Sequence, residues 1–284
     1  MDTLELRELR YFVTVAEELH FSRAAQRLGI AQPPLSRAIQ QLERRLGVSL
    51  FDRDRRGVTL TGAGEVLLHE ARVLLDGAAA AARRTRRAAS GSGPRRLTLA
   101  TKAGANHELL RKLLAVYAAE PDAAEVEVLP CAMGEQARML RDGRADVAFM
   151  QRPFDALTGL DTQDVLTEGQ VAILPATHPL AARETLTMAD VRGLPDLPLA
   201  RWPRQDGTYD PGPGPEIKDL SQLAQLIALG QTVAVLCASS RTWLWNAHAA
   251  VPLTDSPEVT TVLAWPAHSR SRAVAGLVRA AAGL

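Results

Sequence analysis

Two adjacent prolines, Pro33 and Pro34, stand directly before a run with clear helical periodicity, and this junction constrains the start of the chain most strongly. Proline has no backbone N–H, so it is tolerated in the first turn of a helix, where those groups lack intrahelical partners. The apolar positions that follow have helical spacing: Leu35, Ile39, Leu42 and Leu46. The sequence therefore predicts a helix whose first turn is stiffened by proline.

Two more amphipathic segments precede this helix. The first has apolar residues at helical spacing: Leu6, Leu9, Val13 and Ala16. The second is short, with Ser22 as its expected N-cap and Gly29 where a left-handed C-terminal residue belongs. Three helices joined by tight turns within fifty residues predict a helix-turn-helix unit.

The third helix also has a polar face, opposite its apolar stripe. Its side chains are Gln32, Ser36, Arg37 and Gln40. A recognition helix places its N-terminal residues against base edges, where Arg suits guanine and Gln suits adenine. Pro33 and Pro34 add an apolar surface suited to thymine methyl groups. These residues predict binding to double-stranded DNA, and the alternative is a helical unit that serves only assembly.

A small hairpin and a long helix follow. Residues 48–61 place the basic tip 52–57 between two β-prone segments, which predicts a wing. Residues 62–89 contain no proline and predict one long linker helix, for which Thr61 is the expected cap. Its apolar positions repeat as in a helix that pairs with another: Leu67, Ala71, Leu74, Ala78, Ala81 and Ala88. We expect this helix to form a homodimer.

Charge is distributed unevenly along the 284 residues. The first 89 residues carry 15 Lys and Arg against 11 Asp and Glu, although the net charge of the whole chain is only +1. A basic first third suits a polyanionic partner. The N-terminus lacks the apolar segment of a signal peptide, and no apolar run is long enough to span a bilayer. We therefore expect a cytoplasmic protein with no membrane partner.

The remainder of the chain has a different pattern. Residues 90–94, SGSGP, predict a flexible linker. Beyond it, strand-like and helix-like segments alternate, which predicts an α/β domain that begins as β-α-β-α-β with parallel strands. We expect a break at residues 152–164, strands at residues 197–201 and 259–265, and an irregular loop at residues 203–215.

Catalytic and metal-binding patterns are not found. The six histidines are scattered without the spacing of a metal site, and there is no GxSxG nucleophile motif. We expect no enzymatic activity, no metal and no cofactor. Cys131 and Cys237 are far apart in sequence and suggest neither a disulfide framework nor a zinc site, but they leave open a redox-sensing regulator as an alternative.

The first domain resembles a known family. The segment FSRAAQRLGIAQPPLSRAIQQLERRLGVSLFDR, followed by GVTLTGAGEVLL, is similar to the N-terminal signature of LysR-type transcriptional regulators. DGRADVAF and ALGQTVAVLC resemble short pieces of the effector domain of the same family, with Gln231 where a second glycine is more usual. The resemblance covers the first domain nearly end to end, and the second domain in architecture and in these pieces.

The resemblance implies a bacterial regulator with three parts. These are a winged helix-turn-helix at 1–61, a dimerising linker helix at 62–89, and, after the linker 90–94, an effector domain at 95–284. The effector domain would contain two Rossmann-like subdomains similar to periplasmic binding proteins, at 95–152 plus 266–284 and at 153–265. The family usually acts as a tetramer on an interrupted palindromic DNA site, with RNA polymerase as a further partner.

Site residues follow from the same resemblance. On the DNA side they are Gln32, Pro33, Pro34, Ser36 and Arg37 in the reading helix and Arg53 in the wing, and we add Gln40 and Arg55. For a small organic effector at the strand ends they are Thr101, Lys102, Cys131, Ala132, Met133, Phe149, Arg201 and Trp202. The hypothesis is a ligand with an anionic end near Lys102 or Arg201 and an apolar body against Met133, Phe149 or Trp202. The alternative is that Lys102 and Arg201 are surface charges.

Overall fold

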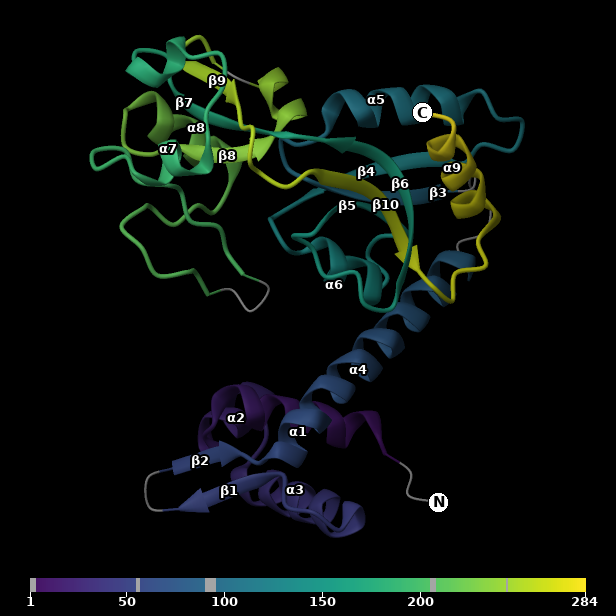
Figure 1. Cartoon of the computed structure of the whole chain (residues 1–284). Coiled ribbons are helices and arrows are strands. Elements are labelled where there is room, and N and C mark those ends of the chain that lie inside the picture. The colour runs from purple at the N-terminus through teal and green to yellow at the C-terminus, as the bar shows by residue number, and fades with distance from the viewer. Residues whose placement is uncertain (1–3, 55–56, 90–95, 205–207, 244) are drawn as a thin grey trace. The chain divides into compact units, whose positions relative to one another are not determined.

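The computed structural model describes residues 4–54, 57–89, 96–204, 208–243 and 245–284 (Figure 1). Chain contacts divide it into two units, one formed mainly by residues 1–89 and the other by most of residues 90–284. In the part of the chain that is described, none of the helices combines the length and apolar content needed to cross a bilayer.

The first unit is a winged helix-turn-helix followed by a long helix, as predicted. Its elements are α1 (Leu6–Glu18), α2 (Phe21–Leu28), α3 (Gln32–Leu46), the hairpin β1 (Phe51–Asp54) and β2 (Gly57–Leu60), and α4 (Gly62–Ala89). Leu35, Ile39 and Leu42 of α3 are fully buried in one core with residues of α1 and α2. The helical spacing of the apolar residues therefore sets which face of α3 turns inward.

The start of α2 differs from the prediction. His20, and not Ser22, is the N-cap, because the His20 ring accepts the backbone N–H of Arg23. Ser22 lies inside the first turn, and its hydroxyl donates to the side-chain oxygen of Gln32 at 3.1 Å. The predicted end of α2 is confirmed, because Gly29 has the left-handed φ of 67°.

The junction between the wing and α4 is tightly built. The hydroxyl of Thr61 caps α4 by accepting the Gly64 N–H at 3.0 Å, and it donates to the carbonyl of Ser49. A Cβ at Gly64 would lie 2.2 Å from the carbonyl oxygen of Leu50. Only glycine fits there, since real Cβ atoms do not approach a backbone atom so closely.

The apolar residues of α4 only partly follow the predicted dimer seam. Ala71 is fully buried and Leu67 half-buried in the core of the first unit, so these two positions serve their own domain. The large apolar side chains that α4 exposes are Val66, Val73 and Leu74. The side chain of Ala88 lies outside the described residues.

The second unit contains two sheets. The larger sheet has the order β4-β3-β5-β10-β6, formed by β3 (Arg96–Lys102), β4 (Glu125–Cys131), β5 (Val147–Arg152), β6 (Leu160–Glu168) and β10 (Val259–Pro266). β3, β4 and β5 are parallel, as predicted, whereas β10 is antiparallel to its neighbours β5 and β6. Helices α5 (His107–Ala118) and α9 (Arg272–Ala282) cover one face, and α6 (Gln136–Arg141) packs on the other.

The smaller sheet is antiparallel, with the order β8-β7-β9. Its strands are β7 (Gln170–Pro175), β8 (Ala234–Cys237) and β9 (His248–Pro252). The helices α7 (Met188–Arg192) and α8 (Leu220–Ala228) and the 3₁₀ turns η1 (Pro179–Ala182) and η2 (Ala238–Trp243) belong to the same half of the chain.

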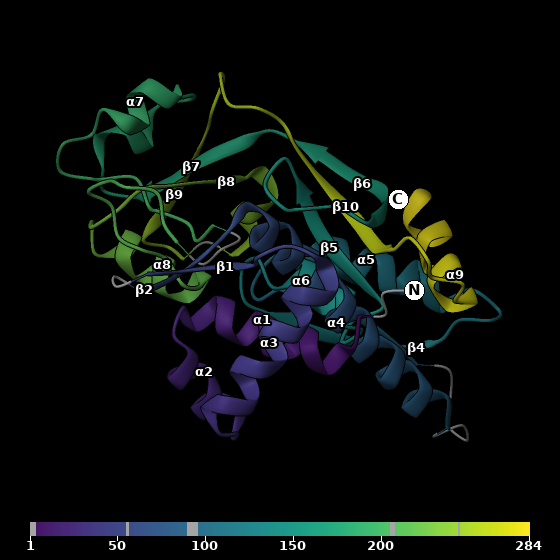
Figure 2. The same cartoon turned by 90° about the horizontal axis from the view of Figure 1, so that it is seen from below.

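The predicted subdomain boundaries at 152 and 266 are wrong. Figure 2 shows β6 beside β10, and both strands belong to the larger sheet. The chain therefore leaves this sheet after Glu168 and returns to it at Val259. β6 lies within and beyond the break predicted at 152–164, because this edge strand, LDTQDVLTE, is mostly polar and lacks the apolar run of a central strand. The strand predicted at 197–201 is replaced by isolated bridges at Leu199 and Arg201.

Candidate nucleic-acid interface and ligand site

Helix α3 exposes the polar face that its sequence predicts. Leu35 and Ile39 are buried, while Ser36 is half-buried between them and the surface. The remaining predicted reading residues are exposed: Gln32, Pro33, Pro34, Arg37 and Gln40. The helix thus presents two prolines, two amides and a guanidinium on one solvent-facing surface.

The first turn of α3 is held from outside the helix. Its N-cap is Ala31, which offers no side-chain acceptor. The hydrogen bond from Ser22 to Gln32 joins α2 to this turn and occupies the side-chain oxygen of Gln32. The amide NH₂ of Gln32 remains available as a donor to a base acceptor or a phosphate.

Arg37 is the exposed cation of this face. Within the described residues its guanidinium makes no hydrogen bond or ion pair. An exposed and unpaired arginine can donate to guanine or to phosphate without first losing a protein partner.

The wing arginine has a different environment. The guanidinium of Arg53 lies 4.6 Å from the centre of the Phe21 ring, and its Nη2 donates to Glu43 at 3.2 Å. The other carboxylate oxygen of Glu43 accepts the backbone N–H groups of Leu50 and Phe51. Arg53 therefore ties the wing to α2 and α3 and is not a free phosphate ligand in this structure. Arg55 lies outside the described residues.

In the second unit, Lys102 forms the centre of a buried polar cluster at the end of β3. The Lys102 residue is only 9% exposed, so the alternative of a surface charge is wrong. Its ammonium group donates to the side-chain oxygen of Gln151 at 3.0 Å and to Asp155 at 3.1 Å. The Asp155 carboxylate also accepts the backbone N–H of Gln151 at 2.7 Å. The cation is thus paired inside the protein.

The two cysteines lie on either side of this cluster. The Cys131 thiol donates to the carbonyl of Thr101 at 3.4 Å, and the Cys237 thiol accepts the side-chain N–H of Gln151 at 3.2 Å. Burial is the main cause that raises the pKa of each thiol to about 11, and Glu135 near Cys131 and Glu168 near Cys237 add to it. Both cysteines are therefore protonated thiols near neutral pH.

The other predicted ligand residues divide into two groups. Ala132 is exposed and Met133 half-buried in the turn after β4, as expected for the rim of a site. Phe149 is 1% exposed in the core beneath α5 and α9, so it cannot contact a ligand in this structure. Side chains alternate along β5, and Phe149 points to the face that the helices cover.

Arg201 and Trp202 shape the neighbouring loop. The Arg201 guanidinium donates to the carbonyls of Gly214 and Asp210 and to the Glu216 carboxylate, at 2.6, 2.8 and 3.2 Å. Trp202 is half-buried against the core that α8 covers. The prediction of Arg201 as a free anion receptor is not supported, because its donors order the loop that follows.

Gln151 and Asp155 are the cluster residues that the sequence did not reveal. Gln151 is the penultimate residue of β5, and Asp155 lies in the turn after it. Neither belongs to a recognisable motif. Their importance comes from contacts with Lys102, 49 and 53 residues earlier in the chain.

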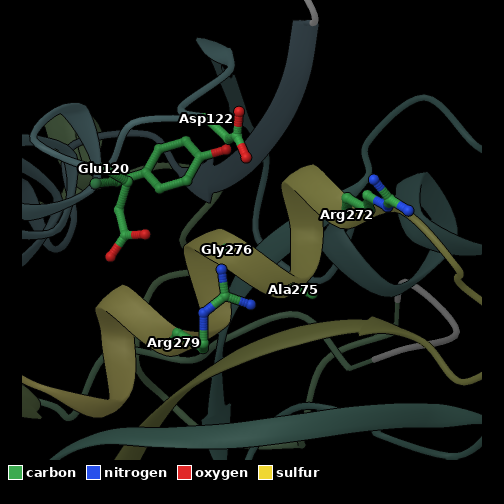
Figure 3. A pocket seen from close by; sticks show the side chains of 7 residues that line it. Glu120, Asp122, Arg272, Ala275, Gly276 and Arg279 are labelled. Carbon is green, nitrogen blue, oxygen red and sulfur yellow. The ribbon is translucent and has the colours of Figure 1, made fainter.

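A separate pocket lies between α5 and α9 (Figure 3). Its volume is about 170 Å³, and its lining includes Tyr117, Glu120, Asp122, Arg272 and Arg279. It is near the C-terminal end of α5 and the start of β4, away from Lys102. Because ligands of α/β sheets bind at the carboxyl ends of strands, this pocket is not the expected effector site.

Fold and site together define a class: a winged helix-turn-helix with a solvent-facing reading helix, joined to an α/β domain with a buried polar cluster at its strand ends. Residues 6–65 match the family described as "Bacterial regulatory helix-turn-helix protein, lysR family". Residues 90–283 match the "LysR substrate binding domain". The chain belongs to the LysR family of DNA-binding transcriptional regulators with an effector-binding domain.

Individual relatives agree with this assignment. The chain is 30% identical to the regulator BudR of Raoultella terrigena over 95% of this chain and 98% of that protein. It is 35% identical to AlsR of Bacillus subtilis, over 70% of this chain and 66% of that protein. Among solved structures, full-length CbnR complexed with its target DNA has a TM-score of 0.58 and 25% identity, with 98% of this chain and 99% of that chain covered.

Proposed function

We propose that the chain binds an interrupted palindromic DNA site as a homodimer, or as a tetramer built from two dimers, and that a small organic effector changes these DNA contacts. The observation that carries the DNA part is the exposed face of α3, on which Arg37 has no partner among the residues that the structure describes. The similarity to CbnR, which was solved with its target DNA, supports it.

The residue types on α3 predict which part of the DNA each side chain contacts. Arg37 and Gln40 suit direct contacts to guanine and adenine, whereas the half-buried Ser36 suits a backbone phosphate. Phosphate contacts release counterions, so binding should weaken steeply as salt rises. A dimer places its two reading helices about one helical turn or a multiple of it apart, which sets the spacing of the half-sites.

Dimerisation would use α4. Val66, Val73 and Leu74 are large apolar side chains that the first unit leaves exposed on this helix, and Val66 and Val73 are one heptad apart. Exposed apolar rows of this kind bury surface when two helices pack together. Sedimentation would test this, because Leu74→Lys should shift the protein toward a monomer, whereas Leu229→Lys, also at an exposed leucine, should not.

The effector would act at the end of β3, where Lys102, Gln151 and the two thiols meet. It would shift the population between two arrangements of the effector domain and so change the spacing of paired reading helices. A change in that spacing could also alter contact with RNA polymerase. The redox alternative is disfavoured, because a thiol with a pKa of about 11 is a poor nucleophile toward oxidants.

Footprinting tests the DNA part directly. The pure protein would be footprinted on the DNA upstream of its own gene, together with Arg37→Ala and the control Arg7→Ala, which removes another exposed arginine outside α3. We expect specific protection by the wild type and the control, and roughly ten- to hundredfold weaker binding by Arg37→Ala. Equal protection by all three proteins would contradict the role of α3.

A further inference from the structure

We propose that the effector of this chain carries no net charge, and that Asp155 is the residue that sets this specificity. The inference rests on the proposed function, since it concerns the ligand of that same cluster. It reverses the expectation, drawn from sequence, of a ligand with an anionic end at Lys102.

The first step is that Lys102 already has an anion. Its ammonium group pairs with Asp155, and the two side chains are only 11% and 10% exposed. An ion pair so far from solvent is little screened by water or salt. An anionic ligand that took the place of the Asp155 carboxylate would leave that charge buried without its partner, and one at the third N–H of Lys102 would lie beside the Asp155 carboxylate; both arrangements are unfavourable.

The second step is that Asp155 is fixed in place. Its carboxylate accepts the backbone N–H of Gln151, and its own N–H donates to the Gln151 carbonyl at 2.8 Å. Gln151 also spans the cluster, because its side chain joins Lys102 to the Cys237 thiol. The carboxylate therefore belongs to a hydrogen-bonded turn and is not a mobile surface group.

The third step concerns the charges around the pair. Those that act on the two thiols are the carboxylates of Asp155, Glu135 and Glu168 and the cations Lys102 and Arg144. With the Lys102–Asp155 pair itself included, these are three negative groups and two positive ones. The nearby guanidinium of Arg144 is itself engaged in an interaction. The surroundings thus offer no excess of positive charge to an anion.

The last step is that neutral hydrogen-bonding capacity is left over. Thr101 and Thr261 are 5% and 0% exposed, and among the described residues their hydroxyls have no hydrogen-bond partner. Thr261 lies directly opposite Gln151 across β10 and β5, on the face that also holds Phe149, while Thr101 and Lys102 are consecutive in β3 and alternate between the faces. Buried hydroxyl groups are normally paired, so these two are unused neutral hydrogen-bonding capacity near the ends of β3 and β5.

Matched pairs of small probes test the charge rule. Acetamide and acetate, and benzamide and benzoate, would be titrated by calorimetry at constant ionic strength into the full chain. The wild type should bind each amide more tightly than its carboxylate. In Asp155→Asn, which keeps the shape but removes the charge, we expect the ratio of carboxylate to amide affinity to rise at least tenfold, because Lys102 becomes an unpaired cation.

A double variant is the control for a loss of folding in the single variant. Lys102→Met with Asp155→Asn removes both charges and should keep the preference of the wild type for amides. The inference is overturned if wild-type protein prefers a carboxylate, if the ratio does not change in Asp155→Asn, if the double variant keeps the raised carboxylate affinity of Asp155→Asn, or if neither kind of probe binds any variant. Footprinting the same proteins without probe distinguishes the proposed DNA binding from the uncharged effector. Normal DNA protection together with no charge selectivity would contradict only the inference about the effector.

Discussion

Two cations show how differently the two halves of this protein use charge. Arg37 lies on the solvent-facing side of α3 and has no partner among the described residues, while Lys102 is 9% exposed and is bound to Gln151 and Asp155. An arginine that awaits a polyanion must stay hydrated and free, whereas a buried ammonium must be paired to be tolerated. On α3 the first unit therefore leaves Arg37 for a partner, whereas the second unit pairs its buried Lys102 internally.

Removing the two cations should have opposite effects on stability and function. Lys102→Met leaves the Asp155 carboxylate buried and unpaired, so we expect the free energy of unfolding of the effector domain to fall by about 3 to 5 kcal/mol. Arg37→Ala should change stability by less than about 0.5 kcal/mol. Urea unfolding would be followed by tryptophan fluorescence for Lys102→Met, because all four tryptophans lie in the second unit, and by hydrogen exchange of residues 6–60 for Arg37→Ala. Equal losses in the two variants would contradict the comparison.

At the junction between the wing and α4 in the first unit, stability should depend on a close backbone contact and not on charge. Gly64→Ala places a methyl group against the carbonyl of Leu50 and should cost about 1 to 3 kcal/mol. Gly62→Ala, two residues earlier in the same helix, has open space and should be neutral or slightly stabilising. Hydrogen exchange of residues 6–60 would report the difference, and equal protection in both variants would show that the junction can relax.

Glu43 is one of the residues through which the first unit uses charge internally, as the Arg45–Glu8 and Arg27–Glu17 pairs also do. Glu43→Ala leaves the N–H groups of Leu50 and Phe51 without their acceptor and frees Arg53, so a loss of about 1 to 3 kcal/mol in stability is expected. Glu43→Gln keeps one acceptor oxygen and should lose less. Thermal unfolding of the wild type, Glu43→Gln and Glu43→Ala should give melting temperatures that fall in that order. Equal melting temperatures of the two variants would contradict the role of the carboxylate oxygens as acceptors.

The smallest expected effect comes from the two thiols. Because their folded pKa of about 11 lies above the usual 9.0, the folded state holds their protons more tightly than the unfolded chain does. Their contribution to stability is therefore complete below about pH 9 and is lost as the pH rises toward 11. The fall in stability from pH 8 to pH 10 should be shallower in a variant with both Cys131→Ala and Cys237→Ala. If stability fell equally with pH in the wild type and in the double variant, the pKa values of the two thiols would be the same in the folded and unfolded states.

Local pattern predicted the first unit well. The helices, the hairpin and the burial of Leu35, Ile39 and Leu42 all follow from spacings within about fifty residues, and the exposed face of α3 follows from the same periodicity. The errors there concern side chains that cross between elements. Ser22 donates to Gln32 and does not cap α2, and Arg53 contacts Phe21 and Glu43 and is not free for phosphate. Contacts between elements decide these side-chain positions, and the local sequence does not show them.

The second unit was less predictable, because its decisive contacts join distant segments. β10 pairs with β5 more than a hundred residues earlier, which moved the subdomain boundaries to 168 and 259. The polar edge strand β6 lacked the apolar run by which central strands are recognised. The positions of Thr101, Lys102 and Cys131 near one another were predicted from strand ends, whereas the partners of Lys102 and Arg201 were not.

The sequence by itself determined the family, the architecture of the DNA-binding unit and the face of α3 that meets solvent, since these depend on residues close together along the chain. Only the tertiary structure decided which charges are free. Lys102 and Arg201 look alike in sequence as candidate anion receptors, yet each is bound by carboxylates or carbonyls from other segments. The electrostatic character of a buried site depends on every group that folding brings around it, and neighbours in the sequence supply only a few of those groups.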